Sequence, residues 1–459
     1  MSQTSENTRE TMRAALEAVH SLTIFRGVLD NPIGRAVLTL FHALVTPEPD
    51  ALEIAQAYSD AFSVLAHAVQ SEEFSSDIPD AWQAYLASAI VDDVNVLSLQ
   101  AEKYKIDVIG VGIREQAKRD IRTLRQLFTL SAQQVWELTE IIVTSVHPGL
   151  HDTWVPWYKL APTRKARITT PRDTLVQMIV ERQNWSTLLE VLIHHWSLHG
   201  TGIFARYVVF RWEGRVEGLR GIIHPDPIQL SDLIGYGHEK QRLQTNLEHF
   251  LHASPAHDAI LYGAPGTGKS STVKALAHAY TDTGLRLIEV SKEFVNDLPA
   301  IVNEVRDHAP RFLLFIDDLS FEEHETTYKA LKVLLEGTVE VRPANVVIYA
   351  TSNRLNLIRE NFADRGKPNE DVHWRDTLDE KASLVARFGL RVTFLTPDQA
   401  QYVDIVVGLV QQRGLMLAEE DLRMRAIAWE RQHTGRSGRL ARQFVDELEA
   451  ELRDKQVTD

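Results

Sequence analysis

The chain of 459 residues is predicted to adopt an α/β fold, in which helices cover both faces of a parallel sheet of five strands. A mainly helical region precedes this core and a small helical region follows it. Three observations predict this architecture. A glycine-rich loop joins an apolar strand to a helix, a second apolar strand ends in two acids, and five short apolar segments alternate with helical ones.

The first predicted region, residues 1–199, has apolar side chains at helical spacing, as in the segments 52–69 and 121–143. The pattern breaks into a loop rich in aromatic residues around Trp154, and it resumes near Thr174. We therefore expect a mainly α-helical N-terminal domain. Its function is not indicated by any motif, and we expect it to recruit an unknown protein partner or to regulate the rest of the chain.

The second predicted region, residues 200–395, alternates between strands and helices. The strand candidates are 259–262, 285–290, 312–316, 345–350 and 391–394. Such alternation is typical of a parallel sheet with a helix after each strand. The third region, residues 396–459, carries two apolar stripes at helical spacing, one from Tyr402 to Val410 and one from Leu440 to Leu452. It is predicted to form a helical lid.

A phosphate-binding loop follows the first strand candidate of the core. It comprises Gly263, Ala264, Pro265, Gly266, Thr267, Gly268, Lys269, Ser270 and Ser271. The glycines let the backbone wrap a polyphosphate, and the following helix directs its positive dipole end at the same anion. Lys269 would reach the β- and γ-phosphates and Ser270 would ligate Mg²⁺. The alternative, a glycine-rich turn that matches by chance, is disfavoured by the flanking strand and helix, so ATP with Mg²⁺ is the expected ligand.

Asp317 and Asp318 directly follow the apolar strand 312–316. The carboxyl ends of parallel strands meet at one edge of a sheet, where the phosphate loop also lies. Asp317 is therefore predicted to hold Mg²⁺ and Asp318 to polarise the attacking water. Taken alone, the pair could instead cap a helix or form a turn.

Three further polar residues complete the predicted constellation. Asn353 lies at the polar end that follows the strand candidate 345–350. It is expected beside the γ-phosphate, where it would position the attacking water. Arg387 precedes the last strand, from which it would reach the nucleotide of a neighbouring subunit rather than its own. Arg436 or Arg439 in the lid would meet the phosphates from above. The alternatives are a surface arginine in a turn for Arg387 and a solvated helix start for the lid pair.

Composition narrows the classes of partner. The net charge of −14, from 63 acids against 49 Lys plus Arg, disfavours a nucleic acid or an anionic membrane as the partner of the whole surface. The chain has no cysteine, which excludes disulfides and thiolate metal sites. No apolar run approaches the ~18 to 20 residues of a membrane span, and the first residues lack a signal-peptide core. We expect a cytoplasmic protein without a membrane partner.

Histidines offer a weaker signal. His147, His151 and Asp152 have a spacing open to a metal, but Pro148 and Gly149 interrupt any helical face between them. A second group, in the helical stretch that ends the first region, is expected to be partly buried rather than functional. It comprises His194, His195 and His199. Neither group is predicted to hold a metal.

Together these motifs resemble those of the AAA+ ATPases. More narrowly, the chain from about residue 200 to about Phe444 resembles the bacterial AAA+ family known as domain of unknown function eight-one-five. The blocks that carry the resemblance are 263–272, 315–322, 331–337, 350–354, 387–389 and 436–439. The resemblance implies Walker A roles for Lys269 and Ser270, and Walker B roles for Asp317 and Asp318. It implies that Asn353 is sensor one, Arg387 an arginine finger and Arg439 sensor two. It also implies a homo-oligomer.

The chain departs from the family pattern at several positions. Ala386 stands where the family has Asp before the finger arginine, and Leu355 and Asn356 replace part of an arginine-rich segment. Asp318 stands where many AAA+ proteins have Glu, and its shorter side chain would slow the activation of water. The segment 291–296 lacks the aromatic-apolar-glycine loop of threading unfoldases, which disfavours that activity.

Three functions are compatible with these features. We favour an oligomeric ATPase that hydrolyses ATP to ADP to remodel a protein or nucleoprotein partner. A slow or non-hydrolysing switch or scaffold is suggested by Asp318 and Ala386. A DNA-associated loader or initiator is suggested by lid arginines, although the net charge opposes it. These are Arg413, Arg423, Arg425, Arg431, Arg436, Arg439 and Arg442.

Overall fold

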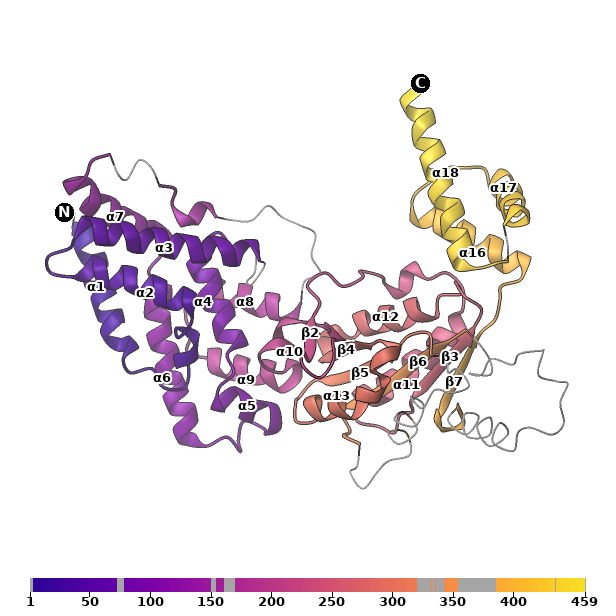
Figure 1. Cartoon of the computed structure of the whole chain (residues 1–459), viewed down its shortest axis with the longest axis horizontal. Helices are drawn as coiled ribbons and strands as arrows, with labels where there is room; N and C mark the ends of the chain where they lie inside the picture. Colours follow the sequence, from indigo (N-terminus) through magenta and orange to yellow (C-terminus); the bar gives the residue numbers. More distant parts are fainter. Residues whose placement is uncertain are drawn as a thin grey trace. The chain divides into compact units, whose positions relative to one another are not determined.

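The computed structural model describes residues 3–71, 78–149, 154–160, 170–319, 331, 335, 342–353, 385–433 and 435–458. The chain divides into two compact units, Met1–Arg206 and Tyr207–Asp459. Each unit has its own apolar core, and each is described by itself below (Figure 1). Within the described part of the chain, no helix is both long and apolar enough to cross a membrane.

The first unit is built from helices. They are α1 (Gln3–Val19), η1 (Arg26–Val28), α2 (Pro32–Val45), α3 (Ala51–Gln70), α4 (Ala81–Asp92), α5 (Val96–Lys103), α6 (Val111–Phe128), α7 (Ala132–Val146), η3 (Trp157–Lys159), α8 (Pro171–Glu181), α9 (Leu188–His199) and α10 (Ile203–Arg206). The segment 121–143, which has one apolar pattern in the sequence, is divided between α6 and α7. The division arises because Ser131 and Gln134 form a capping box that starts a new helix.

Large aromatic side chains fill the core of the first unit. Trp82, Trp157 and Trp196 are almost completely buried. The indole N–H of Trp82 donates to the carbonyl of Leu127 at 3.2 Å, and that of Trp196 donates to the carbonyl of Val91 at 2.8 Å. Because these two donors are satisfied inside the unit, the rings of Trp82 and Trp196 add apolar burial without the cost of an unpaired N–H, whereas the indole N–H of Trp157 is buried without a partner among the described residues.

Charged side chains inside the first unit bond to its own backbone or to each other. A carboxylate oxygen of Asp120 on α6 accepts hydrogen bonds from the backbone N–H groups that follow α1. These donors are Thr23, Ile24 and Phe25, at 3.1, 2.7 and 3.0 Å. The guanidinium of Arg172 donates two bonds of 2.6 Å to Asp92. These groups fix one helix against another, which is a structural task.

The second unit contains a seven-stranded sheet with the order β2-β1-β4-β5-β6-β3-β7. Its strands are β1 (Val209–Trp212), β2 (Leu219–Gly221), β3 (Ala259–Gly263), β4 (Leu285–Val290), β5 (Arg311–Ile316), β6 (Val346–Ser352) and β7 (Leu390–Phe394). All neighbours are parallel except β1 and β2.

The α/β prediction is confirmed, but the predicted count of five strands was too low. The five predicted strands are β3 to β7, and β1 and β2 extend the sheet beyond β4. The central strand β5 is buried almost throughout, whereas β1 has four residues of which two are buried, and β2 has three of which none is buried. Strands as short and as partly exposed as these two lack the continuous apolar run by which buried parallel strands are recognised.

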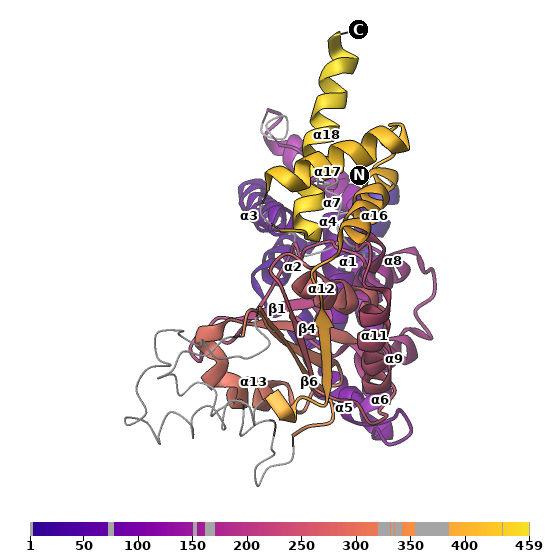
Figure 2. The same ribbon diagram turned by 90° about the vertical axis from the view of Figure 1, so that its right-hand side faces the viewer.

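Helices cover both faces of the sheet. They are η4 (Leu230–Asp232), α11 (Gly237–Leu251), α12 (Lys269–Ala279), η5 (Thr281–Thr283), η6 (Lys292–Asp297) and α13 (Leu298–Val305). One core cluster joins α11 and α12 to alternate residues of five strands. Figure 2 shows α13 on the opposite side of the sheet from α11 and α12. This two-sided cover is the arrangement that a parallel sheet requires.

Three helices follow β7 and pack around a separate apolar cluster, which we call the lid. They are α16 (Gln399–Gln412), α17 (Glu419–Gln432) and α18 (Gly438–Thr458). The lid contacts the sheet-bearing part through several residues, among them Gln412, whose side chain donates to the carbonyl of Ser231. Ile234 packs against the lid cluster, and the backbone N–H of Arg439 donates to the carbonyl of Gly266 at 3.2 Å. The start of α18 therefore lies on the phosphate loop.

Candidate functional site

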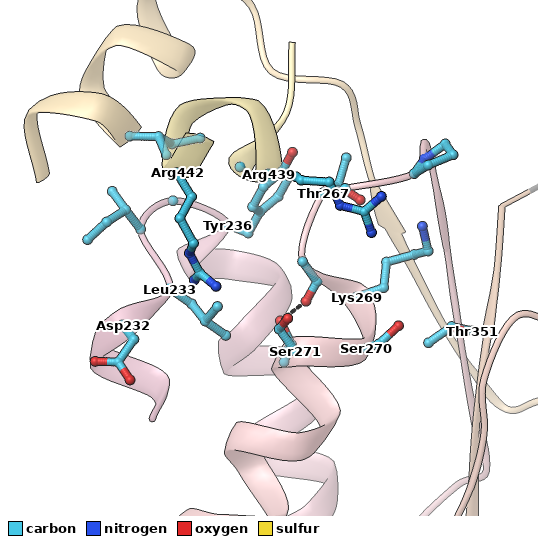
Figure 3. Close-up of a pocket in the computed structure, with 18 of the residues that line it drawn as sticks. Asp232, Leu233, Tyr236, Thr267, Lys269, Ser270, Ser271, Thr351, Arg439 and Arg442 are labelled. Carbon is cyan, nitrogen blue, oxygen red and sulfur yellow. Dashed lines mark hydrogen bonds between the residues drawn. The ribbon is translucent and has the colours of Figure 1, made fainter. Parts of the chain in front are cut away.

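A cavity of about 540 Å³ lies at the carboxyl ends of β3, β5 and β6 (Figure 3). Its walls come from the loop after β3, the ends of β5 and β6, the segment 232–236 before α11, and the lid helices α16 and α18. Ligands of parallel α/β sheets bind at this edge, because the loops that follow the strands converge there. The volume lies in the range typical of sites for small molecules.

The loop after β3 has the backbone of a phosphate-binding loop. Gly266 and Gly268 have φ values of +80° and +93°, a conformation that side chains disfavour. A Cβ at Gly266 would also lie 3.0 Å from the Ser437 hydroxyl of the lid. Helix α12 begins at Lys269, so its positive end faces the loop. The residues from Pro265 to Ser271 line the cavity.

Lys269 is buried and bonded on three sides. Its Nζ donates to the carbonyls of Gly263 and Ala264 at 2.7 and 2.9 Å, and to Oδ1 of Asn353 at 3.0 Å. Burial lowers the pKa of Lys269; the carboxylates of Asp317 and Asp318 oppose that shift, and the charge of Arg439 adds to it. Lys269 is the cation at the centre of the cavity wall.

Asp317 and Asp318 lie at the end of β5 and contact polar groups of two other elements. Oδ1 of Asp317 accepts from the hydroxyls of Ser270 at 2.6 Å and Thr351 at 2.5 Å. Oδ1 of Asp318 accepts from Nδ2 of Asn353 at 2.7 Å. Asn353 thus bridges Lys269 and Asp318, as expected for the end of a strand that pairs with both β3 and β5.

Asp318 adopts a left-handed backbone conformation, with φ of +51°. Its backbone N–H donates to the hydroxyl of Thr351 at 2.9 Å. A non-glycine residue in this region is strained, and the strain persists where the surroundings fix the backbone. Thr351, which is about 1% exposed, supplies that restraint because the same hydroxyl also donates to Asp317. Sequence reasoning gave Thr351 no role; the signal was a polar residue at the end of an apolar strand.

Ser270 and Asp317 fit a magnesium ion by their chemistry. A hydroxyl and a carboxylate are hard oxygen ligands, and their oxygens lie 2.6 Å apart. Among the described residues, no group of three or more His, Cys, Asp or Glu side chains is placed to hold a metal by itself. In proteins, Mg²⁺ is commonly held by one or two protein ligands, with substrate phosphates and water completing its coordination.

The lid contributes two arginines to the cavity. Arg439 and Arg442 of α18 both line it, whereas Arg436 donates at 2.7 Å to Glu430 on α17. The structure thus places Arg439, and not Arg436, at the cavity. Arg442 was not assigned to the site by sequence reasoning, although it lies one helical turn beyond Arg439.

The other end of the cavity has several apolar side chains, with Asp232 and Lys240 also in its lining. Leu233, Ile234, Ile405 and Leu409 line it together with Tyr236. Lys240 donates to the carbonyl of Leu233 at 2.5 Å, and the hydroxyl of Tyr236 donates to the carbonyl of Leu395 at 2.6 Å. An apolar end beside a phosphate-binding end matches the two parts of a nucleotide. Sequence reasoning missed this wall, because its residues carry no motif.

The structure does not bring Arg387 to this cavity. It precedes β7 at the edge of the sheet where Leu390 pairs with Ala259, the first residue of β3. The phosphate loop follows the last residue of β3, and a strand of five residues spans about 16 Å. Arg387 therefore lies at the opposite edge of the sheet from the phosphate loop.

Some residues of the sequence prediction lie outside the described ranges. They are His151 and Asp152, Leu355 and Asn356, and parts of the blocks 315–322, 331–337 and 350–354.

Comparisons with known proteins show which family the chain resembles. Residues 205–452 match the family described as "Protein of unknown function (DUF815)". The chain is 28% identical to "ATPase family gene 2 protein" of Schizosaccharomyces pombe, over 46% of this chain and 30% of that protein. It is 37% identical to "26S proteasome regulatory subunit 4 homolog" of Dictyostelium discoideum, over 37% of this chain and 45% of that protein. The chain spans less than two thirds of the length of its first curated relatives.

Solved structures show a weaker likeness. The Thermotoga maritima "RuvB Holliday junction branch migration motor" has a TM-score of 0.33 at 17% identity, covering 47% of this chain and 62% of that one. The FIGL-1 AAA domain in complex with ADP has a TM-score of 0.35 at 18% identity, covering 50% and 75%. The family of the chain follows from the match of residues 205–452 to the family model. Because that match spans more than half of the chain, the protein belongs to the DUF815 family, within the AAA+ superfamily.

Proposed function

We propose that this protein is a Mg²⁺-dependent ATPase that hydrolyses ATP to ADP and phosphate and uses the reaction to remodel a protein or nucleoprotein partner. The observation that carries the proposal is the bridge made by Asn353, which joins Lys269 to Asp318 at the wall of the cavity. A phosphate-binding cation, an acid and an amide that positions water are thus gathered at one point, as phosphoryl transfer to water requires.

Each residue has a distinct task in this proposal. Lys269 binds the β- and γ-phosphates, and Asn353 orients the attacking water. Asp318 accepts the proton of that water as its oxygen attacks the γ-phosphorus and the bond to the β-γ bridging oxygen breaks. Mg²⁺, when bound with ATP, neutralises phosphate charge, and Ser270 and Asp317 are the residues that would hold it.

Release of phosphate from ATP by the full-length protein tests this proposal. We expect turnover in the presence of Mg²⁺, and we expect Asp318→Asn to retain ATP binding while losing turnover by roughly 10²- to 10⁴-fold, because a general base is removed. Equal turnover by the two proteins would exclude Asp318 as the base. Failure of the wild type to bind ATP at all would exclude the ATPase.

A second candidate function is a nucleotide-dependent switch. It is favoured by one observation, namely that Asp318 is strained and already bonded to Asn353. If that contact persists when ATP binds, the acid is not available to water, and the protein would change shape on binding without fast hydrolysis. Tight ATP binding with no turnover by the wild type would support this candidate over the ATPase.

We further propose that the protein works as a homo-oligomer in which Arg387 reaches the nucleotide of a neighbouring subunit. Its place at the far edge of the sheet supports this, since it cannot reach its own cavity. Arg387→Ala should lower turnover with little change in affinity. Mixing it with Asp318→Asn protein should restore part of the activity, because each variant supplies the residue that the other lacks. No restoration at any ratio would contradict the shared site.

The partner is proposed to bind the first unit, none of whose described residues lines the cavity. A DNA-associated function is less favoured. Among the lid arginines that suggested it, several form ion pairs inside the lid. These pairs are Arg413 with Asp446 and Glu449, Arg423 with Glu419, Arg425 with Glu451, and Arg436 with Glu430. Charges neutralised in this way contribute little attraction for phosphate backbones.

A further inference from the structure

Arg442 is a cation of the cavity that the proposed hydrolysis does not use. It lies on α18 three residues after Arg439, and both side chains line the cavity. Residues three apart lie on the same face of a helix, with Cβ atoms roughly 5–6 Å apart. The backbone N–H of Arg439 is bonded to Gly266, so this face of α18 is anchored directly on the phosphate loop.

The two arginines differ from most of their neighbours in the lid. In the described part of the chain, neither Arg439 nor Arg442 forms an ion pair with an acid, whereas Arg413, Arg425 and Arg436 each do. Both guanidinium-bearing residues are exposed at the cavity. Their forked donors are therefore available to an anionic ligand, and a phosphate is the anion that matches this fork.

The two side chains extend toward different parts of the cavity. Figure 3 shows Arg439 reaching toward Thr267 and Lys269, and Arg442 reaching toward Leu233 and Ser271. Lys269 marks the position of the β- and γ-phosphates. Leu233 belongs to the apolar end, where the nucleoside fits. Arg442 thus lies over the part of a nucleotide that joins the nucleoside to its phosphates.

We propose that Arg442 binds the α-phosphate of the nucleotide, while Arg439 binds the terminal phosphates. This inference rests on the proposed function, in that it requires the cavity to hold a nucleoside di- or triphosphate. The α-phosphate is present in both ATP and ADP, so the contact of Arg442 survives hydrolysis. Arg439 loses part of its ligand when the γ-phosphate leaves. Arg442 therefore keeps the lid closed over ADP, and it slows the release of the product.

The test compares nucleotide affinities of full-length variants by titration calorimetry. The two ligands are Mg–ADP and a Mg-bound ATP analogue with a non-hydrolysable β-γ bridge. Arg442→Ala should weaken the binding of both nucleotides by a similar factor of roughly tenfold or more, because a charge-assisted hydrogen bond is lost. Arg439→Ala should weaken the ATP analogue several-fold more than ADP. The matched control is Arg453→Ala on the same helix, whose exposed pair with Glu449 lies outside the cavity and whose loss should change neither affinity.

Two further measurements sharpen the test. Arg442→Lys keeps the charge but not the forked donors of the guanidinium. Its nucleotide affinity should therefore lie between those of the wild type and Arg442→Ala. Stopped-flow release of a fluorescent ADP analogue should be faster from Arg442→Ala than from the wild type. Because Arg442 is exposed, the variant should melt at the wild-type temperature without nucleotide, which would show that the change is in binding.

The possible failures are distinguishable. If wild type and Arg453→Ala bind both nucleotides and Arg442→Ala binds them equally well, the role of Arg442 is wrong and the proposed function stands. A selective loss of the ATP analogue by Arg442→Ala would also overturn it, because the contact would then be to the γ-phosphate. If the wild type binds neither nucleotide, the proposed function falls and this inference falls with it.

Discussion

In the first unit, Asp120 accepts three hydrogen bonds from backbone N–H groups, whereas in the second unit Lys269, Asn353 and Asp318 bond to one another at the wall of a cavity. Both arrangements satisfy polar groups that are withdrawn from water. They differ in whether a ligand could replace the hydrogen-bond partners. The bonds of Asp120 are closed by the fold itself, but those of Lys269 and Asp318 can be exchanged for bonds to a phosphate and a water.

The comparison teaches how a structural charge can be told from a functional one. The carboxylate of Asp120 is held by backbone N–H groups inside the first unit and does not line the cavity. Side-chain partners that face an open cavity, as at Lys269, leave the group free to change partners. Loss of a residue should therefore affect stability alone in the first unit and nucleotide chemistry in the second.

The largest effect is expected for Asp120→Ala. The variant leaves three backbone donors without an acceptor, which should lower the free energy of unfolding by about 3–5 kcal/mol. Nucleotide affinity of the folded protein should be unchanged, since Asp120 belongs to the other unit. Chemical denaturation followed by tryptophan fluorescence measures the first quantity, and calorimetry the second. A loss of affinity in protein that is still folded would break the comparison.

Lys269→Ala tests the cavity of the second unit. Removal of the ammonium that reaches the β- and γ-phosphates should weaken ATP binding by at least roughly 100-fold. Lys269→Met keeps the apolar stem and should lose ATP binding to the same extent. If loss of packing were the cause, this variant would retain its ATP affinity. Wild-type affinity in either variant would contradict the assignment of the phosphate loop.

The pH dependence of stability sharpens the contrast at Asp93 in the first unit. Burial raises the pKa of Asp93 from 3.8 to about 6, with Asp92 adding to the shift and a bond from Asn95 opposing it. The folded protein thus holds a proton that the unfolded chain releases, so stability falls as pH rises from about 4 to about 6. Relative to Asp93→Asn, the wild type should lose about 2 kcal/mol between pH 4.5 and 7. If the free energies of unfolding of the two proteins changed in parallel with pH, Asp93 would not be the cause of the pH dependence.

Thr351→Val should have the smallest effect. The substitution keeps the shape of a buried side chain but removes the acceptor for the N–H of Asp318 and the donor to Asp317. We expect turnover to fall by about tenfold, since Asp318 loses the restraint on its strained backbone, with little change in ATP affinity. Thr351→Ser keeps the hydroxyl and should retain most of the activity. An equal loss in the serine variant would indicate packing as the cause.

The sequence predicted the parts of this molecule that are local. Strands β3 to β6 were found because buried parallel strands are continuous apolar runs. Strands β1 and β2 were missed because they are short and only two residues of β1 and none of β2 are buried. The loop from Gly263 to Ser271 was found because its glycines and lysine occur together in the chain.

The parts that sequence reasoning missed depend on contacts between distant segments. The apolar wall at Leu233 lies more than 30 residues before Lys269, and Arg442 lies more than 170 residues after it. Neither position carries a pattern that distinguishes it from an ordinary core leucine or surface arginine. Thr351 is similar, since the two hydrogen bonds of its hydroxyl, to Asp317 and to the backbone N–H of Asp318, follow from the pairing of β5 with β6. The roles of Arg387 and Arg439 remain predictions.

Hydrogen–deuterium exchange of the full-length protein, with and without a Mg-bound non-hydrolysable ATP analogue, tests the central claim most directly. We predict slower exchange in peptides that cover 264–271, 317–319, 351–353 and 438–442, because the ligand replaces solvent at these segments. Peptides around Asp120 should exchange at an unchanged rate. Unchanged exchange in all four cavity segments at an excess of nucleotide would contradict the claim that the polar groups of the second unit serve a nucleotide.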